Sequence, residues 1–113
     1  MINWNTLNQQ NQIQDIIAES KKAPVVIFKH STSCTISATA KNRLERQWAE
    51  AGLDEVKPYY LDLLAYRPIS NLVAQTFAVE HQSPQLLLIK DGVCQYDASH
   101  LGINLKEVKK NIV

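Results

Sequence analysis

The stretch VVIFKHSTSCTIS, residues 25–37, decides the fold because two kinds of apolar periodicity meet in it. Residues 25–28 are apolar and rich in β-branched side chains, which predicts a strand buried on both faces, as in a parallel sheet. Residues 29–33 are polar and predict a loop. Residues 35–51 predict a helix that ends at Gly52, a residue type common at helix C-termini. The apolar stripe expected on this helix comprises Ile36, Ala40, Leu44 and Trp48.

The segments on either side extend this pattern to the whole chain. The other predicted elements are, in chain order, a helix over residues 5–20, a strand over 56–63, a helix opened by Pro68, a strand over 86–89, a hairpin turn at Asp91 and Gly92 with an alternating return strand, and a helix capped by Asn104. Strand, helix and strand in that order form a parallel β-α-β unit with a right-handed crossover. The full order, α-β-α-β-α-β-β-α, resembles the thioredoxin-like arrangement. This resemblance implies an α/β fold with a four-stranded mixed sheet flanked by helices.

Length and charge narrow the class of protein. The chain has 113 residues, which predicts that residues 1–113 form one domain. Lys and Arg number 12 and Asp and Glu 11, so the formal net charge is +1. This balance argues against a protein that binds nucleic acid. The 3 histidines are widely separated and show none of the spacings typical of a metal site, so we expect no bound metal.

The sequence also predicts a cytoplasmic location. Residues 1–10 lack the positively charged and apolar regions of a signal peptide. No apolar run approaches the roughly 18 residues that a membrane-spanning helix needs. In a reducing cytosol the 2 cysteines are expected to be free thiols, and so small a number excludes a disulfide-stapled secreted scaffold.

Cys34 occupies a position that favours thiol chemistry. It follows the buried strand and stands at the start of the predicted helix, where unpaired N–H groups and the helix dipole favour the nucleophilic thiolate. Lys29 and His30 lie close upstream and are expected to add positive potential. The alternative is a small buried side chain at a helix start. The neighbouring residues are small and polar, which favours an exposed, reactive thiol; they are Ser31, Thr32, Ser33 and Thr35.

Ser83 and Pro84 precede the third buried strand. In a thioredoxin-like fold the proline at this position is usually cis and packs beside the cysteine. The backbone of the residue before it, here Ser83, is then free to pair with an incoming peptide as an added strand. The alternative is an ordinary trans proline at the start of an edge strand.

Ser37 stands where a thioredoxin-type motif carries a second, resolving cysteine. Serine cannot close an internal disulfide, so a mixed disulfide on Cys34 must await an external thiol. The Ser37 hydroxyl is expected to hydrogen-bond the thiolate, to satisfy local backbone groups as a residue of the first helical turn, or both. Cys94 falls on the apolar face of the return strand and is expected to be a buried core residue. His81 and His100 are expected at the surface.

Four segments resemble the monothiol bacilliredoxins, the thioredoxin-like proteins of the bacillithiol system; they are residues 29–37, 83–85, 90–92 and 98–100. The family motif usually reads Thr-Cys-Pro-Ile-Ser, whereas here Ser33 replaces the threonine and Thr35 the proline. The resemblance implies that the Cys34 thiolate attacks the bacillithiol sulfur of a protein mixed disulfide and releases the protein thiol. A second bacillithiol molecule, or a reductase system, would then clear Cys34.

The residue analysis and the resemblance together give one set of candidate site residues. Cys34 and Ser37 are the catalytic candidates. The substrate-binding candidates are His30, Ser33, Thr35, Ile36, Ser83 and Pro84. The implied partners are bacillithiolated proteins, with bacillithiol as thiol co-substrate and no bound cofactor, and we expect neither nucleic acid nor membrane as a partner.

Two other functions stay open. A non-catalytic thioredoxin-like module would use the Ser83-Pro84 edge to hold a partner protein, and its function would survive Cys34→Ser. An iron–sulfur protein of the monothiol glutaredoxin kind would need an external thiol ligand and usually a dimer. The motif lacks the Gly-Phe that those glutaredoxins carry, so this function ranks last.

Overall fold

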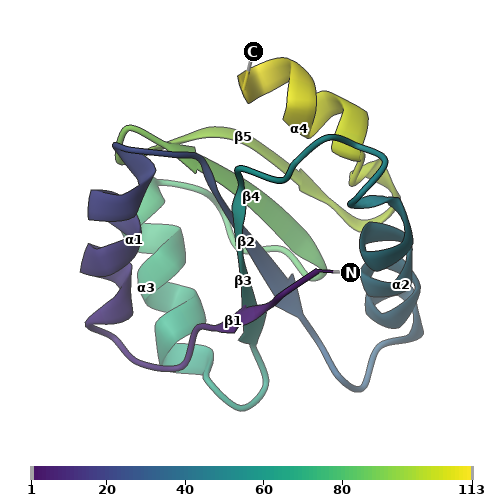
Figure 1. The fold of residues 1–113 in the computed structure, drawn as a ribbon. Helices are drawn as coiled ribbons and strands as arrows, with labels where there is room; N and C mark the ends of the chain where they lie inside the picture. The colour runs from purple at the N-terminus through teal and green to yellow at the C-terminus, as the bar shows by residue number, and fades with distance from the viewer. Residues whose placement is uncertain (1, 113) are drawn as a thin grey trace.

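The computed structural model of the protein describes residues 2–112 (Figure 1). Its strands are β1 (Asn5–Thr6), β2 (Val25–His30), β3 (Lys57–Asp62), β4 (Gln85–Lys90) and β5 (Val93–Ser99). Its helices are α1 (Gln12–Ser20), α2 (Thr35–Gln47), α3 (Arg67–Phe77) and α4 (Leu105–Ile112). A short 3₁₀ turn, η1 (His100–Gly102), precedes α4.

The strands form one mixed sheet in the order β1-β3-β2-β4-β5. β1, β3 and β2 run parallel, whereas β4 is antiparallel to both β2 and β5. The predicted α/β class, the parallel β-α-β unit and the antiparallel hairpin are therefore confirmed. The sheet has five strands instead of the four predicted, because the short β1 adds to the edge formed by β3.

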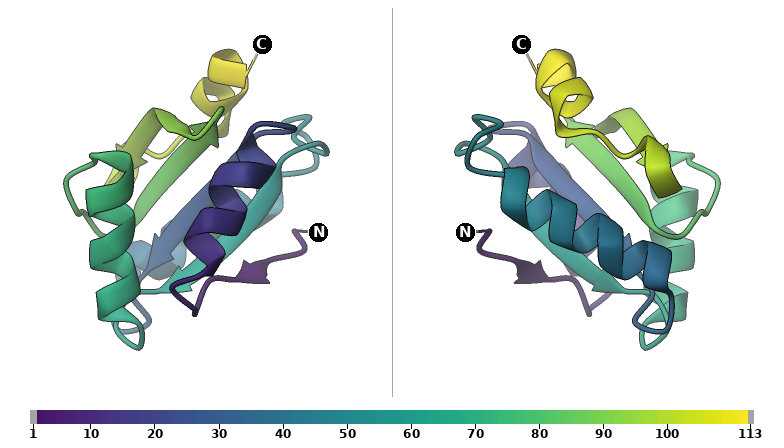
Figure 2. Two further views of the ribbon diagram at one scale, coloured as in Figure 1. Left: turned by 90° about the vertical axis from the view of Figure 1, so that its left-hand side faces the viewer. Right: turned by 90° about the vertical axis from the view of Figure 1, so that its right-hand side faces the viewer.

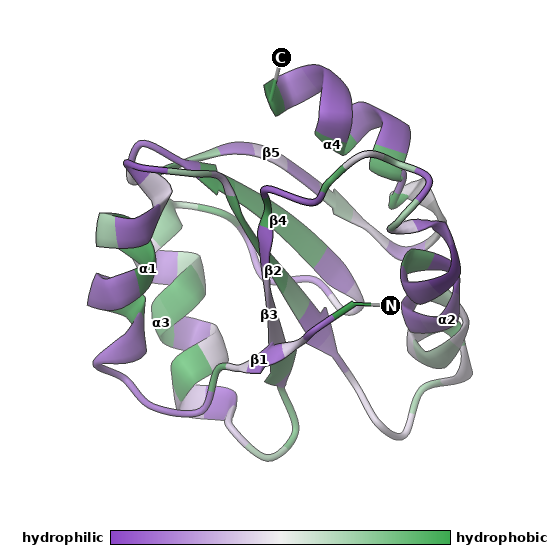
Figure 3. Ribbon diagram, viewed as in Figure 1, coloured by the Kyte–Doolittle hydropathy of each residue, from purple (hydrophilic) through white to green (hydrophobic). Residues whose placement is uncertain are grey.

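Helices cover both faces of the sheet, and each face has its own core. α1 and α3 lie on one face and α2 and α4 on the other (Figure 1, Figure 2). Along β2, Val26 and Phe28 pack on the α2 side, and Val25 and Ile27 pack on the α1 and α3 side. β2 and β4 are hydrophobic over most of their length (Figure 3), as expected for strands buried on both faces. Among residues 2–112, no helix combines the length and the apolar character needed to cross a membrane.

The first helix is shorter than predicted. The apolar spacing predicts a helix over residues 5–20, but β1 and a polar turn occupy its first half and the helix begins at Gln12. The Gln12 carboxamide holds this turn: its oxygen accepts the backbone N–H groups of Asn8 and Gln9, and its nitrogen donates to the carbonyl of Thr6. Local hydrogen bonds between side chain and backbone compete with helix formation, which explains the later start.

β2 is longer than predicted, and its last two residues are buried. The polar side chains of Lys29 and His30 predict a loop, but both residues belong to the strand and pair with β3. Lys29 is 0% exposed and His30 is 6% exposed. A strand can bury polar side chains when they find partners inside the protein, and both of these do.

α2 begins at the predicted residue, but its first turn is more exposed to solvent than predicted. Ala40, Leu44 and Trp48 are buried, as the apolar stripe predicts. The prediction is wrong for Ile36, which is 49% exposed because the first turn of α2 borders a surface hollow instead of the core. The helix ends at Gln47 instead of the predicted residue 51, and a turn follows it up to Gly52, whose φ of 70° is left-handed.

The turns and the cap of the last helix have the local structures that the sequence predicts. The Ser83–Pro84 peptide bond is cis, as predicted. Asp91 and Gly92 have φ values of 54° and 79°, the left-handed conformations that a two-residue hairpin requires. The side chain of Asn104 accepts the N–H of Lys106 at 2.8 Å, which is the predicted helix cap.

Candidate active site around Cys34

Cys34 is the N-cap residue of α2, and its side chain is partly exposed. Its backbone is extended, with φ −111° and ψ 122°. Its N–H donates to the carbonyl of Ser31 at 3.2 Å, and its own carbonyl accepts the N–H of Ala38 at 3.1 Å. Thr32 and Ser33, which precede it, are exposed. The thiol therefore stands at the positively polarised end of α2 and is accessible from solvent.

Two further segments meet the β2–α2 junction at the same edge of the sheet. The carboxyl end of β2 pairs with the amino end of β4, where Lys29 lies opposite Gln85. Pro84 directly precedes Gln85, so the cis bond lies beside the junction that carries the thiol. The carbonyl of Pro84 accepts the N–H of His100 at 3.0 Å, which ties η1 to this edge. The β2–α2 junction, the cis-proline loop and η1 therefore frame one site.

The substrate-binding candidates lie on two sides of this site. The exposed ones on the cysteine side are Ser33, Thr35 and Ile36. In the facing loop Pro84 is buried and Ser83 is half-buried. The Ser83 hydroxyl is itself buried and has no hydrogen-bond partner within residues 2–112. The roles assigned to these residues in binding stay predictions.

Ser37 joins the end of β2 to the first turn of α2. Its side chain is 0% exposed. Its hydroxyl oxygen accepts the N–H of Ser31 at 3.0 Å and lies 2.6 Å from Nδ1 of His30. The prediction that Ser37 satisfies local backbone groups is thereby confirmed. These are the partners of the hydroxyl among the described residues, and its predicted contact with the Cys34 thiolate stays a prediction.

His30 lies beneath the site, where its ring is buried against Ser37. Burial lowers the pKa of His30, and the positive charge of Lys41 adds to this effect. The imidazole is therefore neutral at pH 7, since its ordinary pKa is about 6.5. This placement favours a supporting role under the thiol over the direct substrate contact predicted from the sequence.

Lys29 forms a buried polar cluster on the opposite face of β2, and sequence reasoning missed it. Its ammonium nitrogen donates to the carbonyl of Ser70 in α3 at 3.1 Å and lies 3.3 Å from Nδ1 of His81. Burial lowers the pKa of Lys29 to about 8. His81 is half-buried by this contact instead of lying free at the surface, whereas His100 is exposed as predicted. The signal in the sequence was the strand alternation, which puts Lys29 on the same face as Ile27.

Cys94 is separated from Cys34 by the length of the sheet. In the ladder Cys94 lies opposite Ile89, and Ile89 lies opposite Val25, at the amino end of β2. Cys34 follows the carboxyl end of that strand, which at about 3.3 Å per residue is some 16 Å away. A disulfide requires Cα atoms within about 7 Å, so the two cysteines cannot pair in this fold. Cys94 is partly buried against the core on the α1 and α3 side instead of fully buried as predicted, because it lies on the edge strand β5. Its partial burial, reinforced by the charge of Asp97, raises the pKa of Cys94 to about 11.

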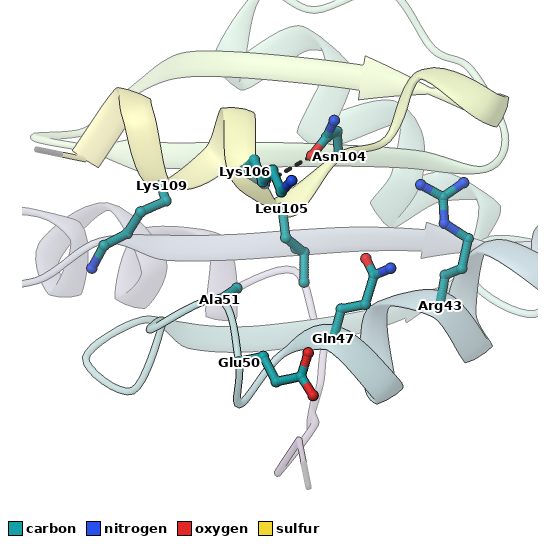
Figure 4. A pocket seen from close by; sticks show the side chains of 8 residues that line it. All are labelled: Arg43, Gln47, Glu50, Ala51, Asn104, Leu105, Lys106 and Lys109. Carbon is teal, nitrogen blue, oxygen red and sulfur yellow. Dashed lines mark hydrogen bonds between the residues drawn. The ribbon is translucent and has the colours of Figure 1, made fainter.

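A hollow of about 160 Å³ opens beside the first turns of α2. Its lining residues are Thr35, Ile36, Thr39, Ala40, Arg43 and His100. A larger hollow of about 550 Å³ continues between α2 and α4, with Arg43 and Lys109 at its opposite ends (Figure 4). Arg43 lines both hollows. The two hollows therefore extend along one side of α2, starting at Thr35, the residue after Cys34.

Comparison with known proteins agrees with this geometry. The family model described as the monothiol bacilliredoxin BrxC matches residues 5–108. A solved structure described as an oxidoreductase with a thioredoxin fold is 28% identical, with a TM-score of 0.80 over 94% of this chain and 90% of that chain. Thioredoxin from Fasciola hepatica is 19% identical, with a TM-score of 0.70 over 96% of this chain and 95% of that chain. Mitochondrial thioredoxin 3 from Saccharomyces cerevisiae has the same identity and TM-score, over 96% and 92%. The two thioredoxins show the fold alone.

An accessible cysteine at a helix N-terminus, beside a cis-proline on a thioredoxin fold, defines a thiol–disulfide oxidoreductase. The protein is an enzyme of this class. Within the class, the match over residues 5–108 shows that the chain belongs to the monothiol bacilliredoxin family. The family resemblance noted from the sequence is therefore confirmed.

Proposed function

We propose that this bacilliredoxin removes bacillithiol from protein mixed disulfides, with Cys34 as the attacking thiolate. The observation that carries the proposal is the isolation of the accessible thiol. Position 37 holds a buried serine, and Cys94 lies at the other end of the sheet, level with the amino end of β2. A nucleophile without a resolving partner keeps a small thiol as a mixed disulfide until a second thiol arrives from solution.

The proposed reaction has two exchanges. In the first, the Cys34 thiolate attacks the bacillithiol sulfur, the protein–bacillithiol S–S bond breaks, and a Cys34–bacillithiol S–S bond forms. The protein sulfur leaves as a thiolate and takes a proton from water. In the second, a free bacillithiol thiolate attacks the bacillithiol sulfur held on Cys34 and regenerates the Cys34 thiolate. The net products are a protein thiol and bacillithiol disulfide, so the electrons come from bacillithiol.

The edge formed by Ser83 and Pro84 is proposed to receive the protein substrate. A peptide that pairs with the Ser83 backbone as an added strand would bring its disulfide next to Cys34. The proximity of the cis-proline loop to the β2–α2 junction supports this arrangement. No bound cofactor enters the proposed reaction, because bacillithiol acts as the thiol co-substrate. A cytoplasmic location belongs to the same proposal, since the second exchange needs a reduced thiol pool.

The proposal is tested by the release of bacillithiol from a bacillithiolated protein, measured as a mass decrease over time in the presence of free bacillithiol. The wild type and Cys94→Ser should release it at the same rate, and Cys34→Ser should not exceed the rate without enzyme. Equal release by wild type and Cys34→Ser would overturn the catalytic assignment and favour a module that only binds partners.

A further inference from the structure

The 160 Å³ hollow is built from one face of α2, and its lining begins at Thr35, the residue after Cys34. Ile36, Ala40 and Arg43 recur at helical spacing on that face, and His100 of η1 closes the opposite wall. Thr35, also in the lining, directly follows the nucleophile. Any group that becomes attached to the Cys34 sulfur is therefore carried by the residue that directly precedes the lining of this hollow.

The hollow is positively charged and has room for a small group. Arg43 is a permanent cation, and no acidic residue stands among the lining residues in the described part of the chain. Among the described residues, Arg43 uses one donor, from Nη2 to the carbonyl of Ile103 at 3.3 Å, and a guanidinium has five. A water molecule occupies about 30 Å³ in the liquid, so the volume suits a substituent of several heavy atoms but not a folded segment.

Helix geometry brings Arg43 within reach of a group on Cys34. The eight residue-to-residue steps from Thr35 to Arg43 span about 12 Å along the helix axis. Side chains on a helix lean toward its N-terminus, so the guanidinium extends back toward the first turn. An anionic substituent several bonds from the sulfur would therefore meet it.

We infer that this hollow binds a carboxylate of the small thiol that Cys34 takes up, and that Arg43 is a specificity-determining residue which favours anionic over neutral thiols. The inference rests on the proposed function, because it takes the small thiol, and not the protein, as the group left on Cys34. The exposed apolar surface of Ile36 covers the stem of the bound group, and Arg43 pairs with its charge.

Stopped-flow kinetics with two chromogenic disulfides tests this inference. Ellman's reagent carries carboxylates and 4,4′-dithiodipyridine is neutral, and each leaves half of itself on the attacked cysteine. All variants carry Cys94→Ser, so that Cys34 is the single thiol. Arg43→Gln should slow Ellman's reagent about three- to five-fold, as expected for a partly solvated ion pair, and should leave the neutral disulfide unchanged. High salt should lower the wild-type preference and have little effect on Arg43→Gln.

Arg46→Gln is the matched control, because Arg46 lies on the same helix but does not line this hollow. An equal slowing of both disulfides by Arg43→Gln, or the same selective loss in Arg46→Gln, would overturn the subsite. The release assay with bacillithiolated protein tests the proposed function separately. A fast, selective reaction with Ellman's reagent but no bacillithiol release would therefore support the anion subsite and contradict bacillithiol as its ligand.

Discussion

At the scale of single residues, the two cysteines are both partly exposed but differ in their environment. Cys34 is partly exposed at the start of α2. Cys94 donates a hydrogen bond from its thiol to the carbonyl of Tyr96 at 3.3 Å, and burial raises its pKa to about 11. At pH 8 only about one Cys94 in a thousand is a thiolate. The count of 2 cysteines in the sequence therefore corresponds to one reactive thiol.

This difference predicts that iodoacetamide at pH 8 adds one carbamidomethyl group, at Cys34, well before it reacts with Cys94. Peptide mapping by mass spectrometry locates the group. Cys34→Ser should stay unmodified over the same time, and Cys94→Ser should react like the wild type. Comparable labelling of both cysteines in the folded protein would contradict the assigned environments.

Buried Lys29 predicts a pH dependence of stability. Its pKa falls from 10.5 in the unfolded chain to about 8 in the folded one, so between these values the unfolded chain binds more protons and folding gains from rising pH. From pH 7 to pH 9 this contribution should raise the free energy of unfolding by about 1 kcal/mol. Other groups titrate in the same range, so the measured quantity is the difference between Lys29→Met and the wild type.

The free energy of unfolding of Lys29→Met, taken relative to the wild type, should fall by about 1 kcal/mol from pH 7 to pH 9. Urea unfolding at both pH values gives the two differences. Lys90→Met, at a half-buried position at the far end of β4, serves as control and should show no comparable change. A difference between Lys29→Met and the wild type that is independent of pH would mean that Lys29 titrates alike in the folded and unfolded states.

At the scale of elements, the β2–α2 junction depends on the Ser37 hydroxyl. Ser37→Ala would leave the buried N–H of Ser31 and Nδ1 of His30 without their partner. An unsatisfied buried polar group costs about 1–3 kcal/mol, and chemical denaturation should show a loss in this range. Ser33→Ala, at an exposed neighbouring position, should change stability by less than about 0.5 kcal/mol. Equal effects of the two substitutions would show that the Ser37 contacts do not stabilise the junction.

Elements with strong periodicity were predictable from the sequence, and those set by side-chain contacts were not. The apolar runs of β2 and β4 and the stripe of α2 predict the sheet and its helices, because burial dictates those patterns. The prediction of a helix before Gln12 was wrong because the Gln12 carboxamide makes three local hydrogen bonds there. The prediction of a loop at Lys29 and His30 was wrong because these side chains find buried partners that lie 41 and 7 residues away in the chain.

The candidate site was predictable to a similar degree. Cys34 and Ser37 could be placed from the order of elements, and the cis bond at Pro84 from the resemblance of that order to a thioredoxin-like fold. The buried position of His30, the Lys29 cluster and the hollow at Arg43 could not, since each depends on packing between segments far apart in the chain. The binding roles of Ser33, Thr35, Ile36 and Ser83 stay predictions.

At the scale of the whole molecule, the sheet has a core on each face. Leu87 packs on the α1 and α3 side and Leu88 on the α2 and α4 side, and both are fully buried. Leu87→Ala and Leu88→Ala should each lower the free energy of unfolding by about 3 kcal/mol. Val93→Ala, at a site that is 52% exposed, should lower it by less than about 0.5 kcal/mol. A small effect for either leucine would show that one face contributes little to the fold.

The central claim is that Cys34 acts alone and takes its second thiol from solution. Intact-mass analysis after exposure to bacillithiol disulfide tests it most directly, with wild type, Cys34→Ser and Cys94→Ser compared. The account predicts one bacillithiol on the wild type and on Cys94→Ser, and none on Cys34→Ser. A wild type that loses two hydrogens and carries no bacillithiol would contradict it, because that product is a disulfide between Cys34 and Cys94.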